Sequence, residues 1–205
     1  AGGSYTQPNF RQTTPSKTRG ITVDQSHIAG DLERVLFTEE QIQSRLAELA
    51  LEVDADYRGE DLLLVGVLKG AVMVMADFSR ALPRHATMDW MAVSSYGKGT
   101  KSSGVVRILK DLDTDVTGRH VLIVEDILDT GLTLSWLSEN LKSRGAASVE
   151  TLVLLRKPEA AQVEVAAKYV GFDIPKEFVV GYGLDYAETY RNLRQIGTLA
   201  PHVYS

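Results

Sequence analysis

Two adjacent acids stand at the end of an apolar run in the stretch VLIVEDILDTGLTL, which occupies positions 121 to 134. Glu125 and Asp126 follow four β-forming apolar residues, and Asp129 lies in the same short turn. Carboxylates accept hydrogen bonds from sugar hydroxyls, bind hard cations such as Mg²⁺ and act as general bases. The spacing therefore indicates a polar ligand site where a buried strand ends.

The residues after these acids favour an anion. Thr130, Gly131 and Thr133 offer hydroxyls and uncrowded backbone N–H groups at the positive end of a predicted helix, which suits a phosphate. Two carboxylates would repel that phosphate unless Mg²⁺ or sugar hydroxyls lie between the acids and the phosphate. The stretch thus predicts a cradle for a phosphorylated sugar. An ordinary strand-to-helix turn is an equally good interpretation of these residues alone. A receiver-like phosphoacceptor site is disfavoured, because the early turn LKGA carries no acidic pair.

Strands and helices alternate along the chain from Asp31 onward. The first predicted helix begins after Thr38, which has capping-box spacing with Gln41, and Gly59 follows its end. The apolar face of this helix consists of Ile42, Leu46, Leu49 and Val53. Strands or extended segments are predicted at 62–67, 88–96, 104–112, 121–124, 149–155, 167–175 and 178–186. Further helices are predicted after Ala71 and after Gly131.

This alternation predicts an α/β fold with a mainly parallel sheet covered by helices. Ligands of such sheets bind beyond the carboxyl ends of the strands. Three polar turns, at 68–71, 125–133 and 156–158, are expected to meet at that edge. No internal repeat or second domain boundary is evident.

The composition limits the classes of protein to consider. The 205 residues are 44% hydrophobic and 24% charged, which suits one domain with a sizeable core. Cysteine is absent, so disulfides and thiol chemistry are excluded. A net charge of -5 and a pI near 5.4 disfavour an electrostatic nucleic-acid binder. No apolar run has the length of a membrane span, and a cytoplasmic protein is expected. The polar residues 1–30 are expected to be a flexible tail.

The stretch at 121–134 closely resembles the phosphoribosyl pyrophosphate (PRPP) signature of type I phosphoribosyltransferases. Residues 31–205 resemble the hypoxanthine-guanine branch of that family through several segments in the family's order. These segments are DLERVLFTEEQI, VLKGA, SSYG, LLRKP and VGFDIPKEFVVGYGLDYAETYRNL. The resemblance implies a twisted, mainly parallel sheet flanked by helices, with a small hood built from N- and C-terminal segments.

The implied activity is Mg²⁺-dependent transfer of the 5-phosphoribosyl group from PRPP to hypoxanthine, and to guanine, in purine salvage. The products would be IMP or GMP and pyrophosphate. The implied partners are PRPP and a 6-oxopurine, with no nucleic acid or membrane, and the implied assembly is a homodimer or homotetramer. The rivals are a xanthine-preferring relative and a PRPP-sensing regulator of the same fold that binds nucleic acid.

The resemblance also implies a role for individual residues. Asp129 is the implied general base at purine N7. The residues implied to bind the ribose and its phosphate are Glu125, Asp126, Asp129, Thr130, Gly131, Leu132 and Thr133. Leu132 stands where the family often has Lys, which matters little if backbone N–H groups bind the phosphate. The implied metal-site residues are Glu125, Asp126 and Asp185.

The remaining implied roles concern pyrophosphate, the purine and a lid. The pyrophosphate contacts would be Leu68, Lys69, Gly70 and Arg191, with a cis peptide in the 68–70 loop. The purine contacts would be Lys157, Phe178, Val179 and Asp185. An ammonium donates and never accepts hydrogen bonds, so Lys157 should favour a 6-oxo group over the 6-amino group of adenine. Ser95 and Tyr96 would open the lid, whose Gly and Ser content favours mobility.

Overall fold

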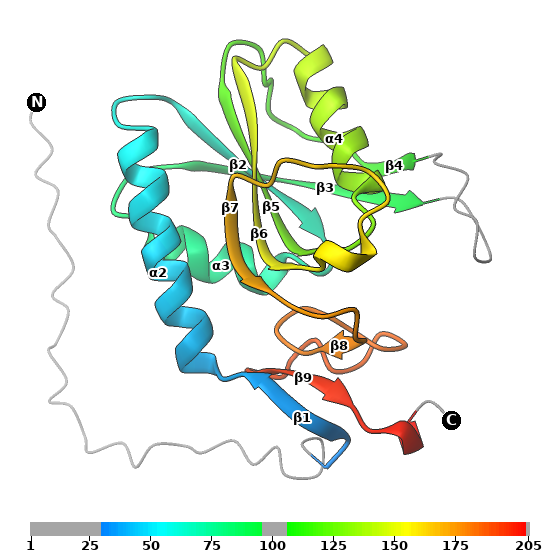
Figure 1. The fold of residues 1–205 in the computed structure, drawn as a ribbon. Helices are drawn as coiled ribbons and strands as arrows, with labels where there is room; N and C mark the ends of the chain where they lie inside the picture. Colours follow the sequence, from blue (N-terminus) through cyan, green and yellow to red (C-terminus); the bar gives the residue numbers. More distant parts are fainter. Residues whose placement is uncertain (1–29, 96–105, 204–205) are drawn as a thin grey trace, which may run out of the picture.

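A six-stranded, mainly parallel sheet forms the centre of the molecule (Figure 1). The computed structural model describes residues 30–95 and 106–203. The strand order is β4-β3-β2-β5-β6-β7, and only the β3–β4 pair in this sheet is antiparallel. The strands are β2 (Leu62–Leu68), β3 (Thr87–Ser95), β4 (Val106–Lys110), β5 (His120–Leu128), β6 (Ser148–Arg156) and β7 (Tyr169–Asp173). The predicted α/β architecture is confirmed.

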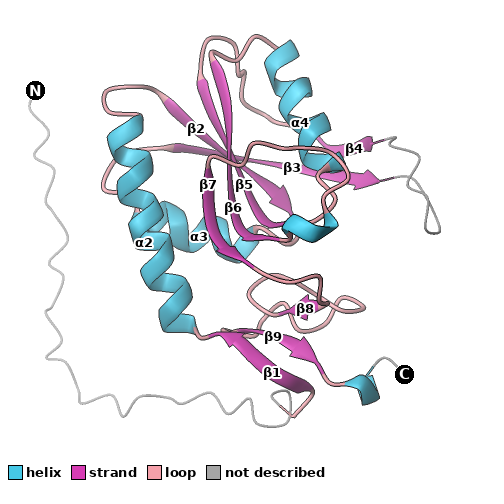
Figure 2. Cartoon of the chain, in the orientation of Figure 1, coloured by secondary structure: helices cyan, strands magenta, loops and turns pink. Residues whose placement is uncertain are grey.

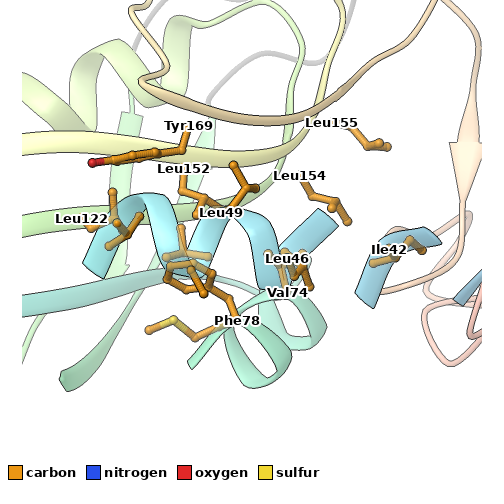
Figure 3. Packing of buried hydrophobic residues seen from close by; sticks show 14 of the residues in the cluster. Ile42, Leu46, Leu49, Val74, Phe78, Leu122, Leu152, Leu154, Leu155 and Tyr169 are labelled. Atoms are coloured by element: carbon orange, nitrogen blue, oxygen red, sulfur yellow. The ribbon is translucent and has the colours of Figure 1, made fainter. Parts of the chain in front are cut away.

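Helices cover both faces of the sheet, which explains why the central strand β2 is apolar throughout. Alternate side chains of a strand point to opposite faces. Leu122 and Leu152 therefore pack against α2 (Glu39–Asp56) and α3 (Val72–Ala81). Figure 3 shows this packing, with Leu46 and Leu49 of α2 and Phe78 of α3. The intervening side chains, such as Ile123, pack against α4 (Leu132–Ser143) on the other face.

The first helix has the predicted start and the predicted apolar face. Thr38 accepts a hydrogen bond from the Gln41 N–H, and the Gln41 side chain accepts one from the Thr38 N–H. The helix ends at Asp56, before Gly59. The buried residues of α2 are Ile42, Leu46, Leu49, Ala50 and Val53.

The strand that carries the paired acids is longer than the sequence predicted. It was expected to end at Val124, but β5 continues to Leu128. Ile127 and Leu128 pair with Leu155 and Arg156 of β6, which extends the ladder past the acids. Glu125 and Asp126 thus belong to the strand, and the turn that follows them begins at Asp129.

A second, three-stranded antiparallel sheet lies beyond the main one (Figure 2). Its order is β1 (Leu32–Phe37), β9 (Ile196–Leu199) and β8 (Val179–Val180). We call this sheet and the connection 181–195 the hood. The predicted origin of the hood in N- and C-terminal segments is confirmed. Two short 3-10 helices, η1 (Pro158–Ala160) and η2 (Pro201–Val203), complete the described structure.

A buried tyrosine links the hood to the main body. The Tyr182 hydroxyl donates a hydrogen bond to the Asp77 carboxylate of α3. The Gln43 side chain of α2 donates to the same carboxylate at 2.5 Å and to the Tyr182 hydroxyl at 3.3 Å. These contacts fix the beginning of the 181–195 connection.

Within the described ranges, none of the helices has the length and apolar character needed to cross a membrane.

Candidate active site

The turn after β5, residues 129–133, presents backbone N–H groups to an open cavity. Gly131 is the N-cap of α4 and has a φ of 83°. The first intrahelical bond runs from the Ser135 N–H to the Gly131 carbonyl at 2.9 Å, so the preceding N–H groups are left for a ligand. A cavity of about 160 Å³ adjoins them. We call this turn the phosphate turn.

A segment that the sequence did not single out holds the phosphate turn in shape. The N–H of Gln162 donates to the Thr130 carbonyl at 2.9 Å. A Cβ atom on Gly131 would lie 2.9 Å from the carbonyl oxygen of Val163, closer than a side chain tolerates. Glycine at 131 is therefore required both by its left-handed backbone and by this contact. No short motif signals such an approach between distant segments.

Glu125 and Asp126 reach different neighbours in the site, and their carboxylates also interact with each other. Glu125 lines the cavity at the phosphate turn. Asp126 lies against Gly70, where an added Cβ atom would clash with its carboxylate. Gly70 belongs to the loop 68–70 after β2, which we call the diphosphate loop. Its Leu68–Lys69 peptide is cis, as the resemblance implied.

The paired acids are held in an environment that disfavours their charge. Burial is the main reason why the pKa of Glu125 is raised well above its ordinary value, and the Asp126 carboxylate adds to the effect. Burial also raises the pKa of Asp126, against the opposing influence of the Ile127 N–H, 2.8 Å from its Oδ1, and of the positive Arg191. Such carboxylates are typical of ligand sites rather than of stabilising ion pairs.

Asp129 and Lys157 meet at the edge of the sheet. Lys157 Nζ lies 3.2 Å from Asp129 Oδ2, with the lysine buried and the aspartate half exposed. The backbone N–H of Lys157 donates to the Leu128 carbonyl at 2.9 Å, so the end of β5 fixes the position of the lysine. The predicted meeting of the turns after β5 and β6 is confirmed.

Charged residues of the hood approach the diphosphate loop. Arg191 Nη2 lies 2.7 Å from Asp185 Oδ1, and Arg191 Nη1 donates to the Gly183 carbonyl at 2.7 Å. Glu188, which was not among the predicted site residues, lies with Oε2 2.9 Å from Lys69 Nζ. The only sequence signal for it was its place between Asp185 and Arg191 in the charged run DYAETYR. Residues implied to contact pyrophosphate are thus brought together.

The hood also carries Phe178 and Val179. Phe178 is 55% exposed and meets Tyr186 edge to face, with ring centroids 5.8 Å apart. Phe178 is therefore not a buried core aromatic. Val179 is buried in β8, paired with Thr198 of β9. The shared role of Phe178 and Lys157 in binding a purine stays a prediction.

Two predicted features lie at the border of the described structure. Ser95 is the last residue of β3. Tyr96 and the rest of the predicted lid lie outside the described residues, as do 1–29 of the predicted tail. In the parts of the chain that the structure describes, no three acidic or histidine side chains are close enough to hold a metal ion by themselves.

The fold and the site together define a type I phosphoribosyltransferase. The carboxyl edge of the sheet carries a phosphate-binding turn beside paired acids, and a hood closes over the same edge. Residues 36–187 match the family described as "Phosphoribosyl transferase domain". The chain belongs to this family, and it is a transferase enzyme.

Individual relatives are similar over most of the chain. The hypoxanthine-guanine phosphoribosyltransferase of Mycobacterium tuberculosis (strain ATCC 25618 / H37Rv) is 60% identical over 181 residues, covering 85% of this chain and 90% of the relative. The hypoxanthine-guanine phosphoribosyltransferase of Bacillus subtilis (strain 168) is 52% identical over 174 residues, covering 85% of this chain and 97% of the relative. A crystal structure of a hypoxanthine phosphoribosyltransferase from Staphylococcus aureus is 50% identical, with a TM-score of 0.86 and coverage of 88% and 98%.

Proposed function

We propose that this chain transfers the 5-phosphoribosyl group of PRPP to hypoxanthine and to guanine, giving IMP or GMP and pyrophosphate. In this reaction the bond from ribose C1 to pyrophosphate breaks, and C1 forms a bond to a purine nitrogen. The purine loses a proton, which the Asp129 carboxylate accepts. Similarity to enzymes with these names supports the proposal.

The contact between Asp129 and Lys157 carries the proposal. A proton acceptor in the phosphate turn lies 3.2 Å from an ammonium on the neighbouring strand. A 6-oxopurine next to the ribose could therefore give its proton to Asp129 while its oxygen accepts from Lys157. The phosphate turn would hold the 5-phosphate, Glu125 and Asp126 the ribose hydroxyls, and Lys69 and Arg191 the pyrophosphate.

Mg²⁺ fits the acids of this site. Mg²⁺ usually takes one or two carboxylates and completes its shell with water and substrate phosphates. Glu125 and Asp126 supply such a partial set, and Asp185 supplies a further carboxylate in the hood. Bound there, Mg²⁺ would neutralise charge on the pyrophosphate as it leaves. Asp126 would orient the ribose, and the hood would exclude water from the reacting carbon.

We also propose the domain bounds, the oligomeric state, the location and the partners of the protein. Residues 31–205 would form one phosphoribosyltransferase domain behind a flexible tail, 1–30. We expect a cytoplasmic homodimer or homotetramer, which sedimentation would distinguish. The partners would be PRPP and a 6-oxopurine, without nucleic acid.

One experiment tests the activity against its rivals. The protein is incubated with PRPP, Mg²⁺ and each purine separately, and nucleotides are separated by chromatography. We expect IMP from hypoxanthine, GMP from guanine and little AMP from adenine. A predominance of XMP would identify a xanthine-preferring enzyme. No nucleotide from any base, with retarded nucleic-acid mobility at physiological salt, would identify a regulator.

A further inference from the structure

One carboxylate of the chain already contacts both cations that the proposed function assigns to pyrophosphate. Glu188 Oε2 lies 2.9 Å from Lys69 Nζ and 3.5 Å from Arg191 Nη2. Lys69 comes from the diphosphate loop and Arg191 from the hood, 122 positions further along the chain. A single oxygen therefore bridges two cations from separate loops, as an oxygen of a diphosphate would.

The backbone of the hood directs Glu188 toward the diphosphate loop. Ala187, Glu188 and Tyr190 have left-handed φ values of 50°, 64° and 73°. This conformation is unfavourable for residues with a side chain, and clusters of it often mark ligand sites. The N–H of Glu188 donates to Asp185 Oδ2 at 2.9 Å, which closes the turn. The two loops touch, since a Cβ atom on Gly183 would clash with the Gly70 carbonyl.

Arg191 keeps its orientation without Glu188. Its guanidinium contacts the Gly183 carbonyl and the Asp185 carboxylate at 2.7 Å each. Lys69, by contrast, has no other ion-pair partner among the described residues, and its side chain is 66% exposed. Glu188 is therefore the ion-pair partner of Lys69, whereas the position of Arg191 depends mainly on Gly183 and Asp185.

We propose that Glu188 is a built-in competitor of the diphosphate. Its carboxylate pairs with Lys69 and Arg191 in the ligand-free protein and leaves them when PRPP or pyrophosphate binds. The inference rests on the proposed function, because it takes Lys69 and Arg191 as diphosphate contacts. An exposed ion pair is weak and screened by salt, so the competition is modest and reversible. Modest competition favours release of the product pyrophosphate without preventing PRPP from binding.

The test compares Glu188→Gln with the unmodified protein by calorimetric titration of inorganic pyrophosphate in Mg²⁺ buffer. Loss of the competing charge should tighten binding by about 2–5-fold at low salt, the equivalent of an exposed ion pair. The gain should largely vanish at roughly 0.5 M salt, where such pairs are screened. In a Lys69→Gln background, Glu188→Gln should have much less effect, because its main partner is gone.

Glu48→Gln is the matched control. Glu48 is as exposed as Glu188, 64% against 65%, and pairs with Arg45 of α2 at 2.7 Å. Glu48→Gln removes the same charge from a residue that pairs with neither Lys69 nor Arg191, so it should leave pyrophosphate affinity unchanged. If Glu188→Gln weakens binding or leaves it unchanged, Glu188 is not a competitor. If the unmodified protein binds no pyrophosphate, the diphosphate site of the proposed function fails as well, which separates the two failures.

Discussion

At the scale of the residue, Asp129 can be tested by a change that keeps its shape. Asp129→Asn retains the size and much of the hydrogen bonding but removes the basicity. We expect little change in PRPP affinity and a loss of kcat of roughly 10²–10⁴-fold, the usual effect of losing a general base. Single-turnover kinetics and calorimetry measure the two quantities. A loss below about threefold at neutral pH would remove Asp129 from the role of base.

Lys157 should decide between purines. Adenine places an amino group where hypoxanthine has an oxygen, so donors of both partners would face each other in a buried position, at a cost of about 1–3 kcal/mol. Lys157→Gln supplies an amide that can donate or accept. We expect hypoxanthine kcat/KM to fall and the hypoxanthine-to-adenine preference to shrink by at least about tenfold.

Competing-base kinetics at saturating PRPP and Mg²⁺ give that preference directly. Lys142→Gln serves as the control, because Lys142 pairs with Glu139 at 3.0 Å on the exposed side of α4. If activity falls while the preference stays fixed, Lys157 acts in folding or in PRPP binding instead.

Single residues were predicted from the sequence only where a local pattern marks them. The acids at the end of β5 and the threonines after it stand in one short stretch, so the sequence alone indicated their chemistry. Glu188 was missed because its partner Lys69 is 119 positions away, and nothing local announces such a contact. Asp77 and Tyr182, 105 positions apart, were missed for the same reason.

At the scale of the element, the start of α4 depends on glycine. Gly131→Ala would place a side chain in the left-handed region, which costs about 1–2 kcal/mol, and would press its Cβ atom against Val163. Gly118→Ala is the matched control, because Gly118 has a φ of 72° with no atom within 4 Å of an added Cβ. Urea unfolding should show a larger loss of unfolding free energy for Gly131→Ala than for Gly118→Ala. Only Gly131→Ala should weaken PRPP binding. Equal losses would mean that the contact with Val163 is relieved at no cost.

Asp89 of β3 holds the connection that follows β4. Its buried carboxylate accepts from the N–H groups of Asp113 at 2.9 Å and Thr114 at 2.8 Å. Burial raises the pKa of Asp89, but hydrogen bonds from Trp90 and Thr114 outweigh it, and the net pKa lies below the ordinary value. A lowered pKa contributes stability that is present above the unfolded pKa, about 3.9, and is lost as pH falls through the folded pKa.

Asp89→Asn should therefore lower the free energy of unfolding by about 1–3 kcal/mol at pH 7. The difference from the unmodified protein should shrink as pH falls below about 4. Urea unfolding across this pH range measures it, with Asp113→Asn, whose side chain is 88% exposed, as the control. A difference that is constant with pH would show that the charge of Asp89 is not involved.

The elements themselves were largely predictable. The sequence pattern indicated the strands of the main sheet but not β1 and β9, and the Thr38–Gln41 capping box indicated the first turn of α2. The end of β5 was misplaced because its last pairs depend on β6, which is distant in sequence. The hood was expected only from resemblance, and the pairing of β1 with β9 within it was not predicted, since short strands distant in sequence share no local signal.

At the scale of the whole molecule, Tyr182 joins the hood to the body. Tyr182→Phe removes the hydroxyl that donates to Asp77 and should cost about 1–3 kcal/mol of stability. Because the hood carries Arg191, we also expect faster hydrogen exchange in 181–193 and a higher KM for PRPP. Tyr169→Phe is the control, since Tyr169 donates to Asp56 at 2.7 Å within the body. Equal exchange in both variants would show that Tyr182 does not anchor the hood.

The position of β9 between β1 and β8 has a consequence for synthesis on the ribosome. Among the described strands, the central strand of the hood comes last in the chain, although one of its partners comes first. During translation the six strands of the main sheet emerge before β9, so the body can assemble while β1 waits unpaired. A nascent chain that has reached β7 would therefore hold the phosphate turn but no hood. We therefore expect enzymatic activity only after β9 has been made and the hood has formed.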